Sequence, residues 1–143
     1  MFIKQLSIFV ENKFGRLEKI ISDLGKNGIN ISALSMADTT DFGILRIIVN
    51  DPEKAREVLR ESGVVAKCTE VLSFVIDDNS GGLANVLKIL TDEKISIEYM
   101  YAFVGNVHGK AIMVVKVSDE ERTEKIFAER GIEMLSPSDV YRI

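Results

Sequence analysis

Two short polar loops carry the residues of this chain whose types and spacing could bind a small molecule. One has the sequence ENKFGRL at 11–17 and the other IDDNSGGL at 76–83, and each joins a strand-like run to a helix-like run. Free N–H groups at the start of a helix attract a carboxylate, and the amide of Asn12 can donate to a carboxylate and accept from an ammonium group. Gly15 would let a ligand approach the backbone closely. Asn12 therefore either binds such a ligand or only caps the helix that follows it.

Patterns typical of catalysis and metal binding are missing from the sequence. His108 is the only histidine and Cys68 the only cysteine, and neither has further ligands or a base at a recognisable motif spacing. The acidic groups at 77–78 and 119–121 precede or begin predicted helices, where the helix macrodipole favours negative charge. The segment DNSGG at 78–82 lacks the lysine and Ser/Thr of a phosphate-binding P-loop. We therefore predict no enzymatic activity, no metal and no cofactor.

The composition excludes several classes of partner. With 143 residues, 46% of them hydrophobic, the chain can bury a core as one medium domain or two small ones. A net charge of −4 and a pI near 5.1 argue against nucleic acid or an anionic membrane, since both need a basic face. Mean hydropathy is only +0.12, and no window approaches the ~18 apolar residues of a membrane span. The first residues lack the features of a signal peptide, so we predict a soluble cytoplasmic protein.

The elements that position the two loops are repeated along the chain. An offset of 66 residues aligns the two halves, and it becomes 68 after a two-residue insertion. The aligned identities are Gly15 with Gly81, Leu17 with Leu83, Leu24 with Leu90, Ile29 with Ile95, Ile31 with Ile97, Gly43 with Gly109, Asp51 with Asp119 and Gly63 with Gly131. Because the predicted elements also follow the same order in both halves, the chain is interpreted as two copies of one unit.

The first copy alternates strand-like and helix-like runs. Strands are predicted over 4–10, 29–37, 44–49 and 64–68, with turn residues at 38–43 between the second and third. The first helix is predicted from an apolar stripe at helical spacing and ends at Gly28; the stripe comprises Leu17, Ile20, Ile21 and Leu24. Asp51 and Pro52 form a good N-cap and first residue for a second helix over 53–62, with the stripe Ala55, Val58 and Leu59.

The second copy repeats this order and completes the predicted fold. Strands are expected over 70–76, 95–104 and 110–117, and helices around two apolar stripes, one of Leu83, Val86, Leu87 and Leu90 and one of Ile126 and Phe127. The prediction is an α+β fold of two tandem ferredoxin-like βαββαβ units, with antiparallel sheets and helices on one face. The predicted domains are 1–66 and 67–143. Several strands are apolar on both faces, so the second face of each sheet is expected to meet another domain or subunit.

Ferredoxin-like units also occur in RNA-binding modules and in acylphosphatases. The central strands at 44–49 and 110–117 hold no aromatic residue on which a base could stack. Tyr99, Tyr101 and Phe103 alternate on one strand, and we assign them to core or interface packing. The first loop does not resemble the arginine-bearing first loop of acylphosphatases. Neither activity is predicted.

The first loop and the segment GINISAL at 28–34 together resemble the ACT domain, a small amino-acid-binding regulatory module. The closest form is the one that ends phosphoglycerate dehydrogenases, with its Glu-Asn-x-x-Gly-x-Leu loop and its Gly-hydrophobic-Asn-Ile strand start. The resemblance covers essentially the whole chain, twice. The chain therefore resembles a tandem ACT protein with no attached enzyme.

The resemblance implies a free amino acid bound between two ACT units. In that family, backbone groups of the loop and helix start hold the main-chain atoms of the effector, and asparagines from the loop and from the partner's second strand bind its polar ends. Asn12 and Asn30 would take those two roles here. The ligand-binding residues that the resemblance implies are Asn12, Lys13, Phe14, Gly15, Arg16, Leu17, Asn30, Ile31, Asp78, Asn79, Ser80, Gly81, Gly82, Leu83 and Ser96.

The two copies differ at the positions that matter most for binding. Asp78 stands where the first copy has Asn12, and Ser96 stands where it has Asn30. The carboxylate of Asp78 could pair with an ammonium group but would repel a carboxylate. The sequence therefore predicts either two unequal sites or sites that combine the loop of one copy with a strand of the other.

The function predicted from these features is an amino-acid-binding regulatory or sensor protein. The alternative is a constitutive oligomerisation or protein-interaction module without a ligand. Each copy of about 70 residues buries only a modest fraction of its surface, so a homodimer is expected. A metabolic enzyme or a regulator is the class of protein partner that this function implies.

Overall fold

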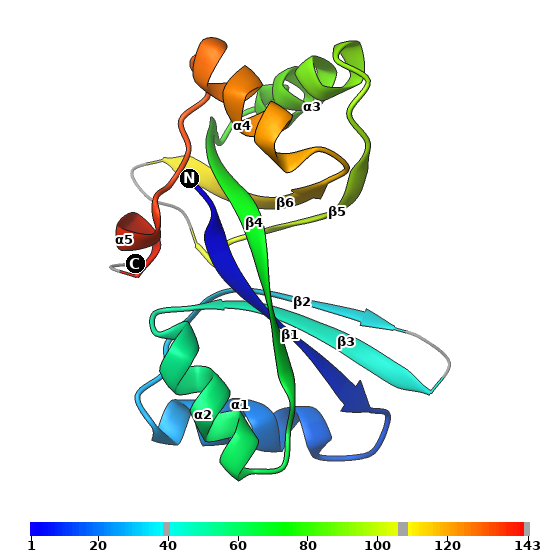
Figure 1. Cartoon of the computed structure of the whole chain (residues 1–143), viewed down its shortest axis with the longest axis vertical. Helices are drawn as coiled ribbons and strands as arrows, with labels where there is room; N and C mark the ends of the chain where they lie inside the picture. Colours follow the sequence, from blue (N-terminus) through cyan, green and yellow to red (C-terminus); the bar gives the residue numbers. More distant parts are fainter. Residues whose placement is uncertain (39–40, 106–108, 142–143) are drawn as a thin grey trace. The chain divides into compact units, whose positions relative to one another are not determined.

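The computed structural model describes residues 1–38, 41–105 and 109–141 (Figure 1). The chain divides into two compact units. The N-terminal unit comprises Lys4–Glu70 and Val140–Ile143, and the C-terminal unit comprises Met1–Ile3 and Val71–Asp139. Each unit thus includes a short segment from the far end of the sequence. The predicted domain boundary between residues 66 and 67 stays a prediction.

Four strands and two helices form the N-terminal unit. In chain order they are β1 (Ile3–Glu11), α1 (Arg16–Lys26), β2 (Ile31–Asp38), β3 (Phe42–Val49), α2 (Pro52–Glu61) and the first part of β4 (Ala66–Asp77). The strand order is β2-β3-β1-β4, and β3 pairs antiparallel with both β1 and β2. Figure 1 shows α1 and α2 on the same face of this sheet.

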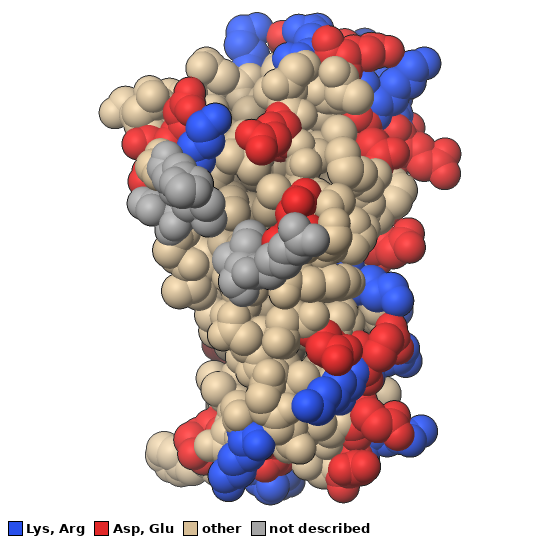
Figure 2. Space-filling view, turned by 90° about the vertical axis from the view of Figure 1, so that its left-hand side faces the viewer, with Lys and Arg blue, Asp and Glu red and all other residues tan. Residues whose placement is uncertain are grey.

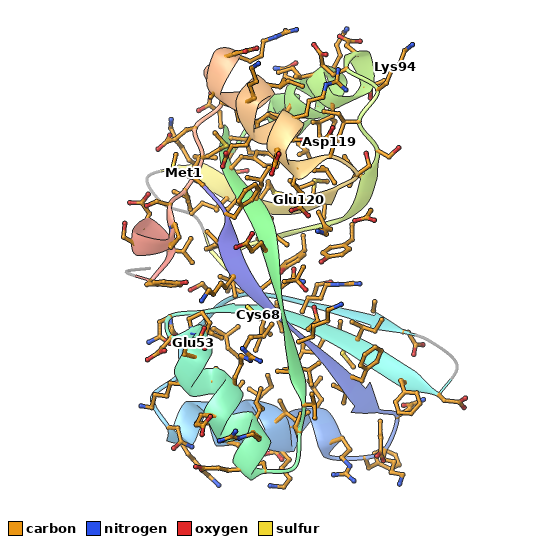
Figure 3. The ribbon with its side chains drawn as sticks, viewed as in Figure 1. Met1, Glu53, Cys68, Lys94, Asp119 and Glu120 are labelled. Atoms are coloured by element: carbon orange, nitrogen blue, oxygen red, sulfur yellow. The ribbon has the colours of Figure 1, made fainter. Side chains whose placement is uncertain are left out.

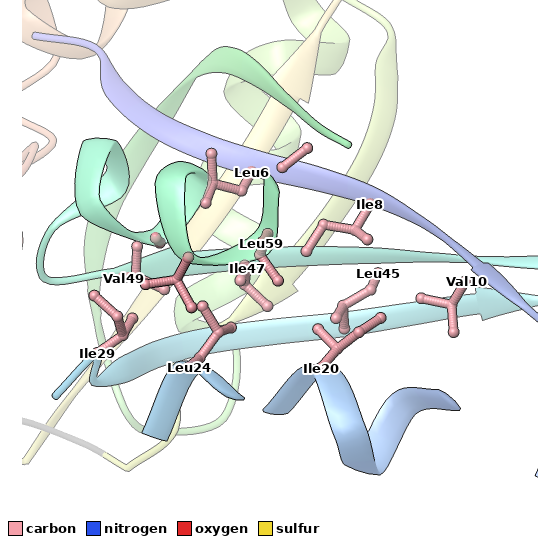
Figure 4. Close-up of a cluster of buried hydrophobic side chains, with 13 residues drawn as sticks. Leu6, Ile8, Val10, Ile20, Leu24, Ile29, Leu45, Ile47, Val49 and Leu59 are labelled. Carbon is pink, nitrogen blue, oxygen red and sulfur yellow. The ribbon is translucent and has the colours of Figure 1, made fainter. Parts of the chain in front are cut away.

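The alternation of side chains along β1 explains the core of this unit. Leu6, Ile8 and Val10 are buried, and Figure 4 shows them packed with Ile20 and Leu24 of α1. Full burial of a side chain of this size is worth about 1.5–3 kcal/mol. This packing fixes the end of β1 relative to the start of α1, and so it positions the loop between them.

The remaining elements form the C-terminal unit. They are the second part of β4, α3 (Gly82–Asp92), β5 (Ile97–Ala102), β6 (Lys110–Val117), α4 (Glu120–Glu129) and, up to Asp139, α5 (Pro137–Val140), with the strand order β4-β6-β5. The core contains Phe74 and Phe127, whose rings meet edge to face with centroids 5.4 Å apart. The predicted fold class, α+β with ferredoxin-like antiparallel sheets, is confirmed.

The predicted helix start signals are confirmed in both units. The carboxylate of Asp51 accepts from the N–H of Lys54 at 3.1 Å, and Pro52 is the first residue of α2. The carboxylate of Asp119 caps α4 in the same way, accepting from the N–H of Arg122 at 3.2 Å. Figure 3 labels Asp119 beside the start of α4.

Three local predictions need correction. The strands expected at 64–68 and 70–76 are one continuous strand, β4, because the residues between them include no glycine or proline that would end it. Leu17 does not begin the buried stripe: it is 37% exposed, since it lies in the first turn of α1 and faces the preceding loop. The last strand of the second copy is reduced to a bridge between Met134 and Phe74.

The surface of the described residues is mixed in charge. Figure 2 shows acidic and basic side chains interspersed on the face that it presents. Within the described ranges, no three His, Cys, Asp or Glu residues gather in a way that could hold a metal ion. No helix in these ranges is long and apolar enough to cross a membrane. His108 and part of the turn predicted at 38–43 lie outside the described residues.

Candidate functional site

The loop between β1 and α1 is held by backbone hydrogen bonds. The N–H of Lys13 donates to the carbonyl oxygen of Glu11 at 2.8 Å, and the N–H of Lys19 donates to that of Gly15 at 2.9 Å. Gly15 is the N-cap of α1 and has a φ of 81°, in the left-handed region that glycine adopts at no steric cost. The glycine singled out in the sequence therefore sets the direction in which the helix leaves the loop.

The loop between β4 and α3 has the same backbone pattern. The N–H of Asn79 donates to the carbonyl oxygen of Asp77 at 2.9 Å, and the N–H of Asn85 donates to that of Gly81 at 3.1 Å. Gly81 is the N-cap of α3 with a φ of 88°. The two loops thus share these hydrogen bonds, with each of their donors and acceptors shifted by 66 residues.

The start of α1 offers two backbone donors to a ligand. The N–H groups of Leu17 and Glu18 donate to no backbone carbonyl among the described residues, and no side chain caps the helix. An open hollow at this position is lined by Asn12, Lys13, Phe14, Gly15, Leu17 and Glu18. Unpaired N–H groups at a helix N-terminus bind a carboxylate well. The arrangement can therefore hold the carboxylate of a small molecule.

The suggestion that Asn12 only caps α1 is wrong. The N-cap position belongs to Gly15, three residues further along, and no side-chain hydrogen bond caps the helix. The side chain of Asn12 is exposed and forms no hydrogen bond with any residue that the structure describes. Its amide is available to a ligand in the hollow that it lines.

Glu11 neutralises part of the positive charge at the first loop. Its Oε2 lies 3.2 Å from Nζ of Lys13 and 3.7 Å from Nη2 of Arg16. The hydrogen bond from Lys13 and the charges of both cations hold the pKa of Glu11 below its ordinary value. One net positive charge remains among these three residues.

The second loop has the opposite local charge. Asp77 lies 3.9 Å from Nζ of Lys110, whereas Asp78 forms no ion pair with any residue in the described ranges. One net negative charge remains among these three residues, so the second loop favours a carboxylate less than the first does.

The second-strand residues of the predicted site lie at the far end of the sheet from their own loop. Asn30 precedes Ile31, the first residue of β2, which pairs with Val49. The end of β1 at Glu11 pairs instead with Phe42, at the other end of β3. At about 3.3 Å per residue these ends are about 23 Å apart. The N-terminal unit by itself therefore does not bring the loop and Asn30 together.

Asn30 and Ser96 nevertheless occupy equivalent backbone positions. The N–H of Asn30 donates to Oδ1 of Asn50 at 2.9 Å, and the N–H of Ser96 donates to Oγ of Ser118 at 3.1 Å. Both residues precede the first residue of an edge strand, β2 or β5. A site that combines Asn30 or Ser96 with a loop therefore needs a loop that does not come from the same unit.

Sequence reasoning missed two residues at this site. Glu18 lines the hollow, and its Oε1 accepts from Oγ of Ser22 at 2.9 Å. Glu11 sets the charge of Lys13 and Arg16. Glu18 could have been predicted from its place in the first turn of α1, beside the loop. The apolar stripe of that helix does not include it.

Comparisons with known proteins show the family of this chain. A family model described as an ACT domain pair matches residues 1–143. The chain belongs to the ACT domain pair family. A solved protein, BT0572 from Bacteroides thetaiotaomicron, is similar to this ACT domain pair over 100% of its length and 98% of the other chain, with 40% identity and a TM-score of 0.93. No curated protein matches this ACT domain pair.

Two solved proteins from Thermus share the fold of this ACT domain pair at low identity. The regulatory subunit of aspartate kinase from Thermus thermophilus, in a ligand-free form, is 14% identical with a TM-score of 0.63, covering 88% of this chain and 91% of the other. The corresponding subunit from Thermus flavus is 13% identical with a TM-score of 0.57, covering 88% and 90%. At these identities the likeness shows the fold alone.

Proposed function

We propose that this ACT domain pair is a regulatory or sensor protein that binds a free amino acid. The observation that carries the proposal is the pair of unpaired N–H groups at Leu17 and Glu18, with the free amide of Asn12 lining the same hollow. The N–H groups suit the carboxylate of an amino acid, and the amide suits its two charged ends. Membership of the ACT domain pair family supports this assignment.

The proposed site combines a loop with a strand start from another unit or another copy of the chain. The first loop contributes Asn12, Lys13, Phe14, Gly15, Arg16 and Leu17, and the strand contributes Asn30 and Ile31. A second, chemically different site would use Asp78, Asn79, Ser80, Gly81, Gly82 and Leu83 with Ser96. The distance between the first loop and Asn30 within one unit supports a shared site, because one unit cannot supply both parts.

The protein acts, in this proposal, without catalysis of its own. Regulation of an enzyme is what the names of the two Thermus subunits describe, and we extend that role to this chain. A homodimer in the cytoplasm, acting on a metabolic enzyme or a regulator, is the arrangement that we propose. No nucleic acid, membrane or cofactor enters this function.

A thermal-shift screen of the twenty amino acids tests the proposal. A ligand that binds only the folded state raises the apparent stability by RT ln(1 + [L]/Kd), which is about 2.7 kcal/mol at a hundredfold excess over Kd. We expect one amino acid or a chemically related group to raise the melting temperature, and the D-enantiomer to do so much less. If no amino acid shifts the transition, the protein is a constitutive assembly module.

A further inference from the structure

The N-terminal unit contains a second hollow, separate from the one at the first loop. Strand β1, helix α1, the connection at 62–65 and the start of β4 line it, and it shares no lining residue with the hollow at Asn12. Its volume is about 340 Å³, within the roughly 300–1,000 Å³ of pockets that hold small ligands. It is called the N-terminal hollow below, and six of its residues carry the argument: Phe9, Glu11, Lys19, Asp23, Val65 and Lys67.

Two of the side chains that line the N-terminal hollow are apolar and exposed. Phe9 is 68% exposed, although its neighbours on β1, Ile8 and Val10, belong to the core, and Val65 is 84% exposed. An aromatic side chain pairs well with a second ring, and covering either side chain removes apolar surface from water. This part of the hollow therefore favours a ligand that carries a ring.

Both acidic side chains of the N-terminal hollow are already paired. Oδ2 of Asp23 lies 3.2 Å from Nζ of Lys19 and accepts from Oγ of Ser62 at 3.0 Å. These hydrogen bonds, first that from Ser62, hold the pKa of Asp23 below its ordinary value. Oε2 of Glu11 lies 3.7 Å from Nη2 of Arg16 and also pairs with the lysine of the first loop. The ammonium group of a ligand would therefore meet no free carboxylate among the residues that line this hollow.

Lys67 supplies a positive charge that remains available. It is exposed and forms no ion pair with any residue in the described part of the chain. Three cations line the hollow (Arg16, Lys19 and Lys67) against two acids (Glu11 and Asp23), which leaves one positive charge in excess. The ammonium group of a lysine donates up to three hydrogen bonds and attracts an anion as a point charge. A ligand with a carboxylate and no ammonium group fits this balance.

The second copy has a hollow at the equivalent place with different chemistry. It is lined by Val75 and Glu133, which stand at the positions of Phe9 and Val65. Val75 is half-buried, and Glu133 adds a carboxylate where the first copy has an apolar side chain. The fold therefore forms the hollow without needing an exposed aromatic residue or a positive charge in it.

We propose that the N-terminal hollow binds a small aromatic carboxylate that lacks an ammonium group. The ring lies against Phe9 and Val65, and the carboxylate pairs with Lys67. This ligand differs from the amino acid proposed for the first loop by the missing ammonium group, and binding at the one site does not depend on binding at the other. Every group that the site uses comes from the N-terminal unit, so the site needs no second copy of the chain.

An NMR titration of the isotope-labelled full chain tests the site with three probes. 3-Phenylpropanoate, L-phenylalanine and 3-phenylpropan-1-ol share one carbon skeleton and differ in their charged groups. We expect 3-phenylpropanoate to bind with a Kd of about 0.1–1 mM, and the other two to bind this hollow at least about fivefold more weakly. The amide signals of Phe9, Val65 and Lys67 should move with 3-phenylpropanoate, and those of 12–15 should not.

Two variants carry residues that the second copy already has at the same positions. Lys67→Leu, which copies Leu135, should weaken 3-phenylpropanoate at least about fivefold and change the affinity for the alcohol by less than about twofold. Val65→Glu, which copies Glu133, should weaken it by about tenfold through charge repulsion. The matched control is Lys54→Glu, which replaces an exposed lysine outside the hollow and should leave the affinity within about twofold of the parent.

The ring contact has a variant of its own. Phe9→Ala should weaken both 3-phenylpropanoate and the alcohol by about tenfold, because both lose the aromatic contact. Circular dichroism would verify that each variant is folded. A folded Phe9→Ala variant that binds like the parent would overturn the placement of the ring, and with it the proposal.

Three further results would overturn the proposal. They are a parent without saturable shifts at this hollow, a parent that binds the acid and the alcohol equally, and a folded Lys67→Leu variant that binds the acid like the parent. Amino-acid binding at the first loop is measured on the same samples with Asn12→Ala. Because the two hollows share no lining residue, loss of one binding with the other retained shows which of the two proposals has failed.

Discussion

The loops at 12–17 and 78–83 share one backbone and differ in nearly every side chain that could touch a ligand. Both place a left-handed glycine at the N-cap, and both begin the helix one residue later. The first loop holds Asn12 and a net positive charge, whereas the second holds Asp78 and a net negative charge. The direction in which each helix leaves its loop is set by the glycine and is therefore independent of the ligand chemistry that the side chains supply.

Replacing the N-cap glycine should have the largest effect on binding. Gly15→Val puts a β-branched residue at a φ of 81°, which costs about 1–2 kcal/mol of stability and displaces the donors at the start of α1. We expect the Kd for the amino acid to rise by more than about 100-fold in calorimetry. Gly81→Val carries the same strain in the second loop and should lose similar stability while keeping the first site. Equal losses of binding in Gly15→Val and Gly81→Val would contradict the assignment of this binding to the first loop.

Removing the amide of Asn12 should have the next largest effect. A hydrogen bond to a charged group contributes about 1.5–3 kcal/mol, so Asn12→Ala should weaken binding by roughly 10- to 100-fold. The free energy of unfolding should change by less than about 0.5 kcal/mol, because Asn12 caps no helix.

The counterpart of that variant is Asp78→Ala. It removes a negative charge that repels a carboxylate, and we expect it to bind the amino acid at least as well as the parent does. Calorimetry on Asn12→Ala and Asp78→Ala measures how each side chain affects the affinity for the amino acid. If Asn12→Ala binds like the parent, Asn12 has no part in the site.

A methyl group at the start of α3 should destabilise the protein more than truncating the side chain at the start of α1. A Cβ built on Gly82 would lie 2.4 Å from the carbonyl oxygen of Asp77, whereas the equivalent position in the first copy already carries Arg16. Gly82→Ala should therefore destabilise the protein by about 1–2 kcal/mol, and Arg16→Ala should change stability by less than about 0.5 kcal/mol. Urea unfolding measures both, and equal values would mean that the second loop is no tighter than the first.

The backbone just after α1 and the backbone just after α3 differ in steric strain. The residue after the C-cap of α1 is Gly28, with a φ of 74°, and the residue after the C-cap of α3 is Lys94, with a φ of 57°; Figure 3 labels Lys94. Glycine relieves the steric cost of this conformation and loses part of the gain to chain entropy, so Lys94→Gly should stabilise by about 0.5–1 kcal/mol. Gly28→Lys should destabilise by a similar amount. Thermal unfolding that shows no gain for Lys94→Gly would contradict this account.

The smallest expected effect concerns an exposed ion pair of the N-terminal unit. Nζ of Lys4 donates to Oε1 of Glu53 at 2.9 Å, and this hydrogen bond and the charge of Lys4 hold the pKa of Glu53 below its ordinary value of 4.5. A carboxyl whose pKa is lowered by folding stabilises the protein above its unfolded pKa, and that contribution is lost as the pH falls through the folded value. Because the pair is solvent-exposed, the contribution is small.

Glu53→Gln should therefore lower the free energy of unfolding at neutral pH, and the difference from the parent should vanish in acid below the folded pKa. Its counterpart in the second copy, Glu121, is exposed and forms no ion pair with any residue the structure describes. Glu121→Gln should therefore change the free energy of unfolding at neutral pH by less than Glu53→Gln does. A constant difference between Glu53→Gln and the parent from acid to neutral pH would exclude the ion pair as its cause.

Local sequence signals predicted much of this fold, and the reason is physical. Asp51, Pro52 and Asp119 start helices through contacts within four residues, so neighbouring sequence suffices to predict them. Gly15 and Gly28 adopt left-handed conformations for an equally local reason. The family resemblance, carried by the first loop and the following strand, is confirmed over the whole chain.

The sequence by itself therefore determined the repeated order of elements, the glycine-directed loops and the family, because each depends on short-range periodicity, capping and turn chemistry. Tertiary structure alone decided that β4 runs unbroken from one unit into the other and that each unit includes a segment from the far end of the chain. It also decided that Asn30 lies at the far end of the sheet from its own loop and that Phe9 is exposed, whereas Val75 at the equivalent position of the second copy is half-buried. These outcomes depend on strand pairing and on packing between residues distant in sequence, which no local pattern encodes.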